Sequence, residues 1–106
     1  MNSNSLCPKF EKAMKLLSQR WSGLIIYQLL SGPQRFGTIE ASLPISGRLL
    51  SERLKDLERE GIVTREVFPE TPVRIEYSLT EKGKALEPAL KEMEKWSQKY
   101  VEVKKL

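Results

Sequence analysis

The spacing of apolar residues changes abruptly in the middle of this 106-residue chain. Leu50, Leu54 and Leu57 recur every three or four residues, which predicts an amphipathic helix. Further along, two short runs, 62–68 and 73–79, are rich in β-branched and aromatic residues at a spacing of two, which predicts a pair of strands. We therefore expect a helix followed by a β-hairpin.

The boundaries of these elements are also marked in the sequence. A short preceding helix, 36–43, should end before Pro44, because a residue that precedes proline is pushed out of the helical region. Ser46 is placed to cap the longer helix, Gly61 to terminate it, and the proline-flanked segment 69–72 to turn the hairpin. The pattern predicts an α+β, mainly α fold: a winged helix-turn-helix with a two-stranded β wing.

The first 30 residues predict two more helices. Pro8 suits the first turn of a helix, and an apolar stripe follows it at helical spacing as far as Trp21. Ser22 is placed to cap a second helix, 23–30, whose apolar residues point nearly all round. Such a helix belongs at the centre of the core.

The C-terminal segment predicts one long helix that opens at Thr80 and is kinked or split early by Pro88. Its apolar stripe includes two aromatic residues and exceeds what a core of this size needs, so we expect it to form a dimer surface. The stripe comprises Leu86, Leu90, Met93, Trp96, Tyr100 and Val103.

Composition excludes several classes of protein. The chain has no histidine and one cysteine, Cys7, so a Ser-His-Asp triad, a His/Cys zinc site and an internal disulfide lack their parts. No glycine-rich phosphate-binding motif occurs, so a nucleotide-binding enzyme is not predicted. We expect no catalytic residue, no metal and no cofactor.

No stretch approaches the roughly 20 apolar residues of a membrane span, and the N-terminus lacks the apolar region of a signal peptide. We expect a cytoplasmic protein without a membrane partner, and one domain over residues 1–106.

The net charge of +4 favours a polyanionic partner, yet the middle of the chain, 31–80, carries seven basic against eight acidic residues. The excess of positive charge therefore lies at the two ends, and charge alone would not locate a DNA-binding segment. Only one cluster in the middle has the right sign: Arg48, Arg53 and Lys55 against Glu52.

The outward side of the helix after Ser46 carries side chains suited to DNA. The second helix of a helix-turn-helix can lie in the major groove with its N-terminal side chains facing base edges. Arginine pairs with guanine, serine suits bases or phosphates, and lysine suits phosphates. We expect DNA contacts from Ser46, Gly47, Arg48, Ser51, Glu52, Arg53 and Lys55.

Each of these assignments has a structural alternative. Charged helical positions usually form a solvated face. Gly47 would let the backbone approach a phosphate closely, or is a tolerated surface glycine. Glu52 and Arg53 can instead form surface ion pairs, which contribute about 0 to 1 kcal/mol.

Three further arginines lie in or beside the predicted hairpin. Arg74, near its tip, is suited to a narrow minor groove or a phosphate, and Arg65 less so. The alternative for Arg74 is pairing with Glu66 or Glu76 across the hairpin. Arg35, at the start of the short helix, is a phosphate contact or simply solvent-exposed.

With these features in place, the chain resembles the HxlR-type transcriptional regulators, a branch of the MarR-like winged-helix proteins. The resemblance covers nearly the whole chain. Its motifs are specific together and weak singly: Cys7-Pro8, Arg20-Trp21, Arg35-Phe36, Ile45-Ser46, RLKDLEREGIV from Arg53, PVRIEYSLTEKG from Pro72, and Trp96.

The resemblance implies a homodimer, built through the first and last helices, that binds an inverted-repeat operator in double-stranded DNA. For members with an N-terminal cysteine it implies sensing of quinones, aldehydes or oxidants. The chain departs from the family at one point, since Gln19-Arg20-Trp21 stands where Gly-Lys-Trp is usual.

Cys7 falls where the N-cap of the first helix should be, with Lys9 and Lys12 nearby. A helix N-terminus and neighbouring cations favour the reactive thiolate form of cysteine. The alternative is an inert thiol beside a frayed terminus. With one cysteine per chain, the available chemistry is S-alkylation, a mixed disulfide with a small thiol, or a bridge to Cys7 of the partner subunit.

We therefore predict a dimeric, sequence-specific DNA-binding regulator, a repressor that responds to quinones, electrophiles or oxidants through Cys7. The alternative is a winged-helix module that binds protein without specific DNA binding. An enzyme with Cys7 as nucleophile lacks a histidine base.

Overall fold

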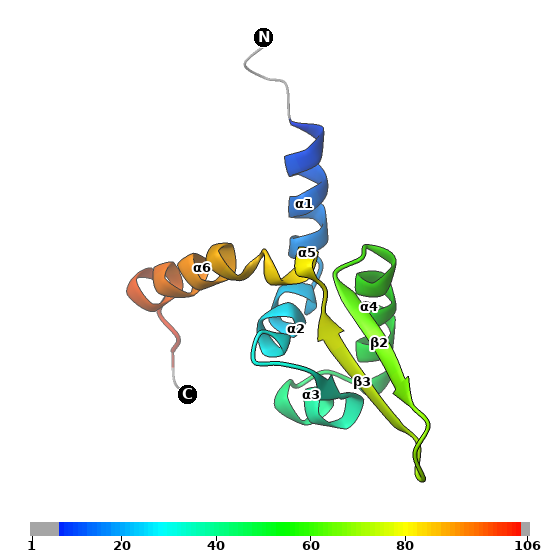
Figure 1. The fold of residues 1–106 in the computed structure, drawn as a ribbon. Coiled ribbons are helices and arrows are strands. Elements are labelled where there is room, and N and C mark those ends of the chain that lie inside the picture. Colours follow the sequence, from blue (N-terminus) through cyan, green and yellow to red (C-terminus); the bar gives the residue numbers. More distant parts are fainter. Residues whose placement is uncertain (1–6, 105–106) are drawn as a thin grey trace.

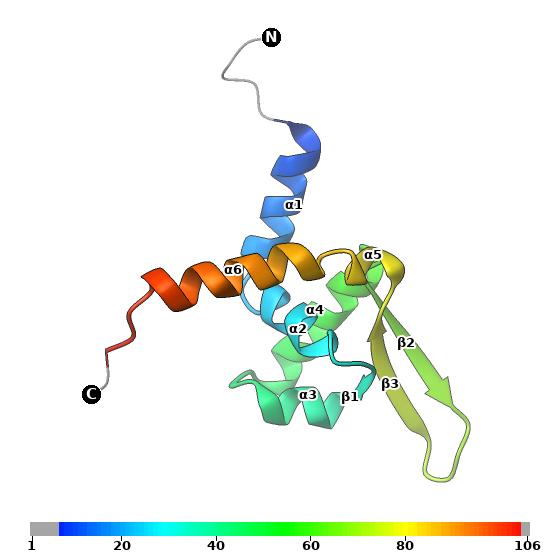
Figure 2. The same ribbon diagram turned by 60° about the vertical axis from the view of Figure 1, so that its left-hand side comes forward.

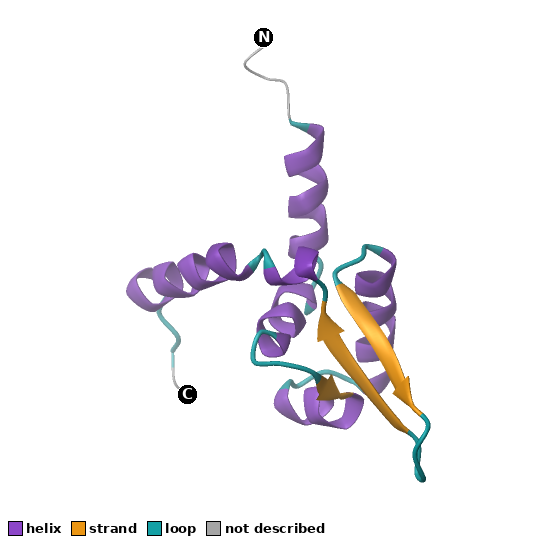
Figure 3. Ribbon diagram, viewed as in Figure 1, coloured by secondary structure: helices purple, strands orange, loops and turns teal. Residues whose placement is uncertain are grey.

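The computed structural model describes residues 7–104 and shows a winged helix-turn-helix (Figures 1 and 3). The predicted α+β, mainly α class is confirmed. The elements are α1 (Pro8–Ser18), α2 (Ser22–Leu29), β1 (Gln34–Arg35), α3 (Phe36–Ser42), α4 (Gly47–Arg59), β2 (Val63–Phe68), β3 (Arg74–Leu79), α5 (Glu81–Lys84) and α6 (Glu87–Tyr100).

The core lies between α2, α4 and the inner face of the hairpin. The predicted central position of α2 and the buried leucine stripe of α4 are both confirmed. Burial of such apolar side chains is the main stabilising term in a domain of this size. The most deeply buried side chains are Ile25, Ile26, Leu29, Ile39, Leu50, Leu54, Leu57 and Ile62.

The predicted caps of α4 are confirmed. The Oγ of Ser46 accepts a hydrogen bond from the backbone N–H of Leu49 at 3.1 Å. At the other end Gly61 has φ +73°, and the N–H of Ile62 reaches back to the carbonyl of Leu57 at 2.9 Å. This Schellman arrangement ends the helix and turns the chain into β2.

The path between α1 and α2 differs from the prediction. Helix α1 ends at Ser18, and Trp21 adopts φ +80°, a left-handed conformation that is rare outside glycine. Ser22 is not a cap: it is the first residue of α2, and its buried Oγ has no hydrogen-bond partner. Because the Trp21 ring is itself buried, its packing can hold the strained backbone in place.

The hairpin gains a strand that sequence patterns did not predict. Two residues, Gln34 and Arg35, pair with Tyr77 and Glu76, so the sheet order is β1-β3-β2. A strand of this length has no periodicity to detect. The predicted proline-flanked turn between β2 and β3 is confirmed.

The predicted early split of the last helix is also confirmed. The chain leaves α5 at Ala85 and starts α6 at Glu87, with Pro88 in the first turn, where its missing N–H costs nothing. Helix α6 ends at Tyr100, so Val103 lies beyond the helix in which it was expected. Helices α1 and α6 extend from the body in different directions (Figure 2).

A group of hydrogen bonds connects the end of α4 to the start of α5. The Oγ1 of Thr80 donates to the carbonyl of Gly61 at 2.6 Å and accepts from the N–H of Gly83 at 3.1 Å. The N–H of Thr80 donates to the carbonyl of Ile62 at 2.9 Å, and the Nζ of Lys82 to that of Glu60 at 2.6 Å. We call these residues the α4–α5 joint.

Gly83 leaves no room for a side chain at this joint. A Cβ atom there would collide with the carbonyl oxygen of Ile62 and would lie 3.1 Å from the side chain of Leu79. We expect Gly83→Ala to lower the free energy of unfolding by about 1 to 3 kcal/mol, as for other overpacked sites. Urea unfolding followed by circular dichroism measures the change.

Gly37→Ala is the matched control, because Gly37 is also helical and has nothing within 4 Å of its Cβ position. Alanine should stabilise α3 there by up to about 1 kcal/mol. Equal unfolding free energies for the two variants would contradict the crowding at Gly83.

Candidate nucleic-acid interface

Three elements lie toward the end of the molecule away from α1 and α6. Helix α3, the N-terminal end of α4 and the tip of the hairpin lie in the lower part of both ribbon views (Figures 1 and 2). This is the arrangement in which a recognition helix and a wing can approach one duplex together.

The first two turns of α4 bring most of the predicted contact residues to one side. Arg48, Glu52 and Lys55 are exposed and follow one another at spacings of four and three, so their side chains project from one face. Ser51 is half-buried on the same side. Exposed Ser46 precedes them as the cap.

The surroundings of Gly47 were predicted by neither of the two expectations, close approach to a phosphate or a tolerated surface glycine. A Cβ atom at this position would lie 2.7 Å from the Oε2 of Glu40, which reaches over from α3. The glycine makes room for that carboxylate beside the N-terminus of α4. A negative charge there is stabilised by the helix dipole.

Arg53 does not lie with the other predicted contacts. Its Nε donates to the backbone carbonyl of Arg20 at 2.9 Å, and its Nη1 lies 3.5 Å from the Oδ2 of Asp56. Because successive helical residues are rotated by about 100°, the neighbour of outward Glu52 faces a different side. The ion-pair alternative is confirmed for Arg53, with Asp56 as its partner, and no ion pair to Glu52 occurs among the described residues.

Arg74 is held inside the wing. Its Nη2 lies 2.8 Å from the Oε2 of Glu70 and its Nε 3.3 Å from the Oε1, while its Nη1 pairs with Glu76. Its guanidinium carbon lies 3.8 Å from the ring centroid of Phe68. Of the two ion-pair partners considered for Arg74 from the sequence, Glu76 is confirmed and Glu66 is wrong. The sequence analysis did not predict the pairing with Glu70.

The same contacts shift the ionisation of both partners. The hydrogen bond from Arg74 lowers the pKa of the Glu70 carboxyl below its usual value. Hydrogen bonds to Glu70 and Glu76 raise the pKa of Arg74 further. Both shifts favour the charged forms of Glu70 and Arg74.

Arg35 and Arg65 lie on the sheet beside this cluster. Arg35 in β1 is opposite Glu76, and Arg65 in β2 is opposite Tyr77. Both are exposed, and the described part of the chain contains no ion pair to either. Their positions suit phosphate contact at the edges of the interface.

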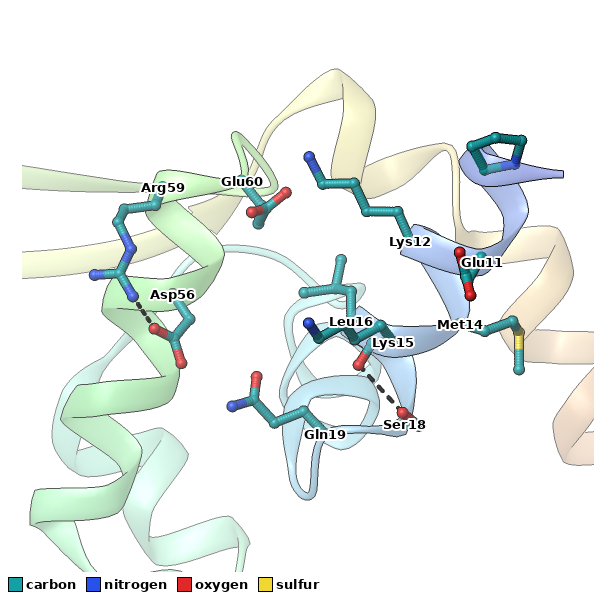
Figure 4. Close-up of a pocket in the computed structure, with 11 residues that line it drawn as sticks. Glu11, Lys12, Met14, Lys15, Leu16, Ser18, Gln19, Asp56, Arg59 and Glu60 are labelled. Carbon is teal, nitrogen blue, oxygen red and sulfur yellow. Dashed lines mark hydrogen bonds and ion pairs between the residues drawn. The ribbon is translucent and has the colours of Figure 1, made fainter. Parts of the chain in front are cut away.

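Cys7 is exposed at the N-cap position of α1, as predicted, and its thiol makes no capping hydrogen bond. A groove of about 1050 Å³ begins at Pro8 and runs between α1 and the end of α4 (Figure 4). Glu11 and Lys12 line one side, and the ion pair of Asp56 with Arg59 the other. Within residues 7–104, no group of three or more side chains could hold a metal ion.

Helices α1 and α6 carry large apolar side chains that no other part of residues 7–104 covers. Helix α1 has no buried residue at all. On α6, Trp96 is 61% exposed and its ring centroid lies 5.7 Å from that of Tyr100. The other exposed apolar residues near these helices are Phe10, Met14, Leu24, Met93, Val101 and Val103. In the part of the chain described, no helix is long and apolar enough to cross a membrane.

The sequence matches the family model of the HxlR-like helix-turn-helix proteins over residues 16–105. The chain belongs to this family. It is a transcriptional regulator, a class of protein without enzymatic activity.

Two relatives from Bacillus subtilis (strain 168) match over almost the full chain. The helix-turn-helix transcriptional regulator YvaP is 62% identical over 103 residues, covering 96% of this chain and 95% of that protein. The regulator YodB is 51% identical over 100 residues, covering 93% of this chain and 89% of that protein.

Solved structures show the same fold. The reduced form of YodB superposes with a TM-score of 0.82 at 50% identity, covering 92% of this chain and 97% of that one. YodB is also known in diamide-treated and quinone-bound forms. The redox regulator HypR in its oxidized form has a TM-score of 0.84 at 37% identity, covering 92% of this chain and 100% of that one.

The cap of α4 gives a direct test of this site's local stability. Ser46→Ala removes the acceptor for the Leu49 N–H and should cost about 1 kcal/mol of unfolding free energy. Ser51→Ala, one turn into the same helix, removes no side-chain hydrogen bond among those described and should leave stability unchanged or slightly raised. Equal thermal midpoints for the two variants would show that the cap contributes nothing.

Proposed function

We propose that this regulator binds an inverted-repeat operator as a homodimer and represses the adjacent genes. The observation that carries the proposal is the outward face of α4, where Arg48, Ser51 and Lys55 are grouped at the exposed start of a capped helix. Arg48 is suited to guanine, Ser51 to a base or a phosphate, and Lys55 to a phosphate. Ser46, Gly47 and Glu52 flank these contacts, and Arg35 and Arg65 contribute phosphate contacts at the edges.

Two operator half-sites require two copies of α4 at a fixed separation of about 34 Å. We propose that α1 and α6 join two subunits for this purpose. Their exposed aromatic and methionine side chains support the proposal, because a free monomer rarely leaves so large an apolar surface in water.

We further propose that Cys7 senses electrophiles or oxidants, including quinones. The thiol is exposed at the tip of α1, beside the proposed dimer surface. YodB, which is similar to this chain over nearly its full length, is known with quinone bound. A Cys7 thiolate that adds to a quinone ring would place a new bulky group at this tip, which would shift the two subunits and the spacing of both α4 helices.

Substitutions on α4 test operator binding. In fluorescence anisotropy on a duplex from upstream of its own gene, we expect Arg48→Ala to weaken binding by about 1 to 3 kcal/mol and relax sequence preference. Lys55→Ala should weaken all sequences alike and reduce the salt slope by about one. Arg59→Ala is the control, since Arg59 is exposed at the far end of the same helix and pairs with Asp56. The proposal is wrong if all three variants bind alike.

The sensor proposal is tested with Cys7→Ser. Quinone or diamide should release the wild-type protein from the operator and leave the variant bound, while untreated affinities should match. Mass spectrometry of the wild type should show one adduct per chain, because Cys7 is its only thiol. Release of the Cys7→Ser variant at the same quinone concentration would remove Cys7 from the mechanism.

A second candidate function is binding of another protein through the same surface. The internal engagement of Arg53 and Arg74 favours it, because these cations are not free for phosphates. Salt dependence separates the candidates: phosphate contacts produce a steep fall of affinity with salt, and a protein partner produces a shallow one.

A further inference from the structure

Glu70 binds Arg74 in the way that a DNA phosphate would. Its two carboxylate oxygens face the Nη2 and Nε atoms of the guanidinium at 2.8 and 3.3 Å. This edge of arginine is the one that phosphates and carboxylates both engage through two parallel hydrogen bonds. Glu76 takes the remaining Nη1, and the Phe68 ring covers one face. The Nε–Nη2 edge of Arg74 is therefore already occupied.

The two carboxylates are not equivalent. Glu70 is 53% exposed and lies in the turn at the wing tip, whereas Glu76 is 25% exposed and sits within β3. A side chain in an exposed turn leaves a contact more easily than one on a paired strand. Glu70 is thus the partner that an incoming phosphate can displace, while Glu76 and Phe68 keep the guanidinium in position.

We propose that Glu70 competes with a DNA phosphate for Arg74, so that the wing contact forms only when the carboxylate leaves. Glu70 is then a determinant of operator affinity, a role separate from the contacts of α4. The inference rests on the proposed operator binding. It adds to that binding the cost of breaking the contact between Glu70 and Arg74. An isolated wing arginine would bind any duplex, whereas an internally paired one binds only where α4 holds the tip against the backbone.

A double-mutant cycle on the full-length protein tests the competition. Glu70→Gln should raise operator affinity at low salt by roughly three- to tenfold and steepen the salt slope by about one. Glu66→Gln is the matched control: it removes the same charge from the same exposed wing, but among the described residues no ion pair or hydrogen bond joins Glu66 to Arg74. Its gain should be clearly smaller.

In an Arg74→Ala background, the gain from Glu70→Gln should fall to that of Glu66→Gln. Arg74→Lys provides a second background, because it keeps the charge and loses the paired hydrogen-bond geometry; the gain should fall there too. Thermal unfolding identifies any variant that does not fold.

Two results would overturn the inference while leaving the proposed function intact. One is a gain from Glu70→Gln no larger than that from Glu66→Gln; the other is a gain that persists undiminished without Arg74. A wild-type protein that fails to bind the upstream duplex, together with all of these variants, would overturn both.

Discussion

The rest of the structure depends on the α4–α5 joint, where Thr80 and Gly83 lie against the chain that leaves the C-terminal end of α4. The contacts are made to backbone carbonyls at Gly61 and Ile62, so they fix the position of α4 itself and not only a side chain. Because Thr80 directly follows β3, the same joint fixes the base of the wing. Since α5 leads into α6, the proposed dimer helix starts from this point as well. One cluster of hydrogen bonds therefore sets the relative positions of the three elements that operator binding requires.

A second link joins α4 to the other proposed dimer helix. Arg53 hydrogen-bonds the carbonyl of Arg20 at the bend between α1 and α2, and the Arg20 guanidinium lies 4.7 Å from the ring centroid of buried Trp21. A reorientation of α1 has to preserve or break this bond. The bend therefore connects α1 to α4. The bend is also where the left-handed Trp21 lies, and where the Ser22 hydroxyl has no hydrogen-bond partner among the described residues.

Local signals in the sequence were enough to predict the long helices and the hairpin. The features that the sequence analysis missed depend on contacts between residues far apart in the chain. The cap at Ser46, the leucine stripe of α4 and the split before Pro88 depend on residues a few positions apart, and each was predicted correctly. The conformation of Trp21 and the two-residue β1 depend on distant packing and pairing. At the interface, the outward side of α4 followed from helical periodicity. The engagement of Arg53 and Arg74 did not, because their partners Arg20 and Glu70 come together only in the folded chain or a tight turn.

These ion pairs and hydrogen bonds bear on how a middle segment with more carboxylates than cations can still present the proposed DNA-binding face. Glu40 sits against the start of α4, Glu70 and Glu76 hold Arg74, and Asp56 pairs with Arg53 and Arg59. Subtracting these internal pairs leaves few free cations near the recognition face, chiefly Arg48, Lys55, Arg35 and Arg65. A protein with so few free cations gains little from nonspecific attraction to the duplex, since that term grows with the number of phosphates neutralised. Base contacts and correct half-site spacing must then supply a larger share of the affinity. In the proposed dimer, a small displacement of the two subunits would therefore be enough to release the proposed operator.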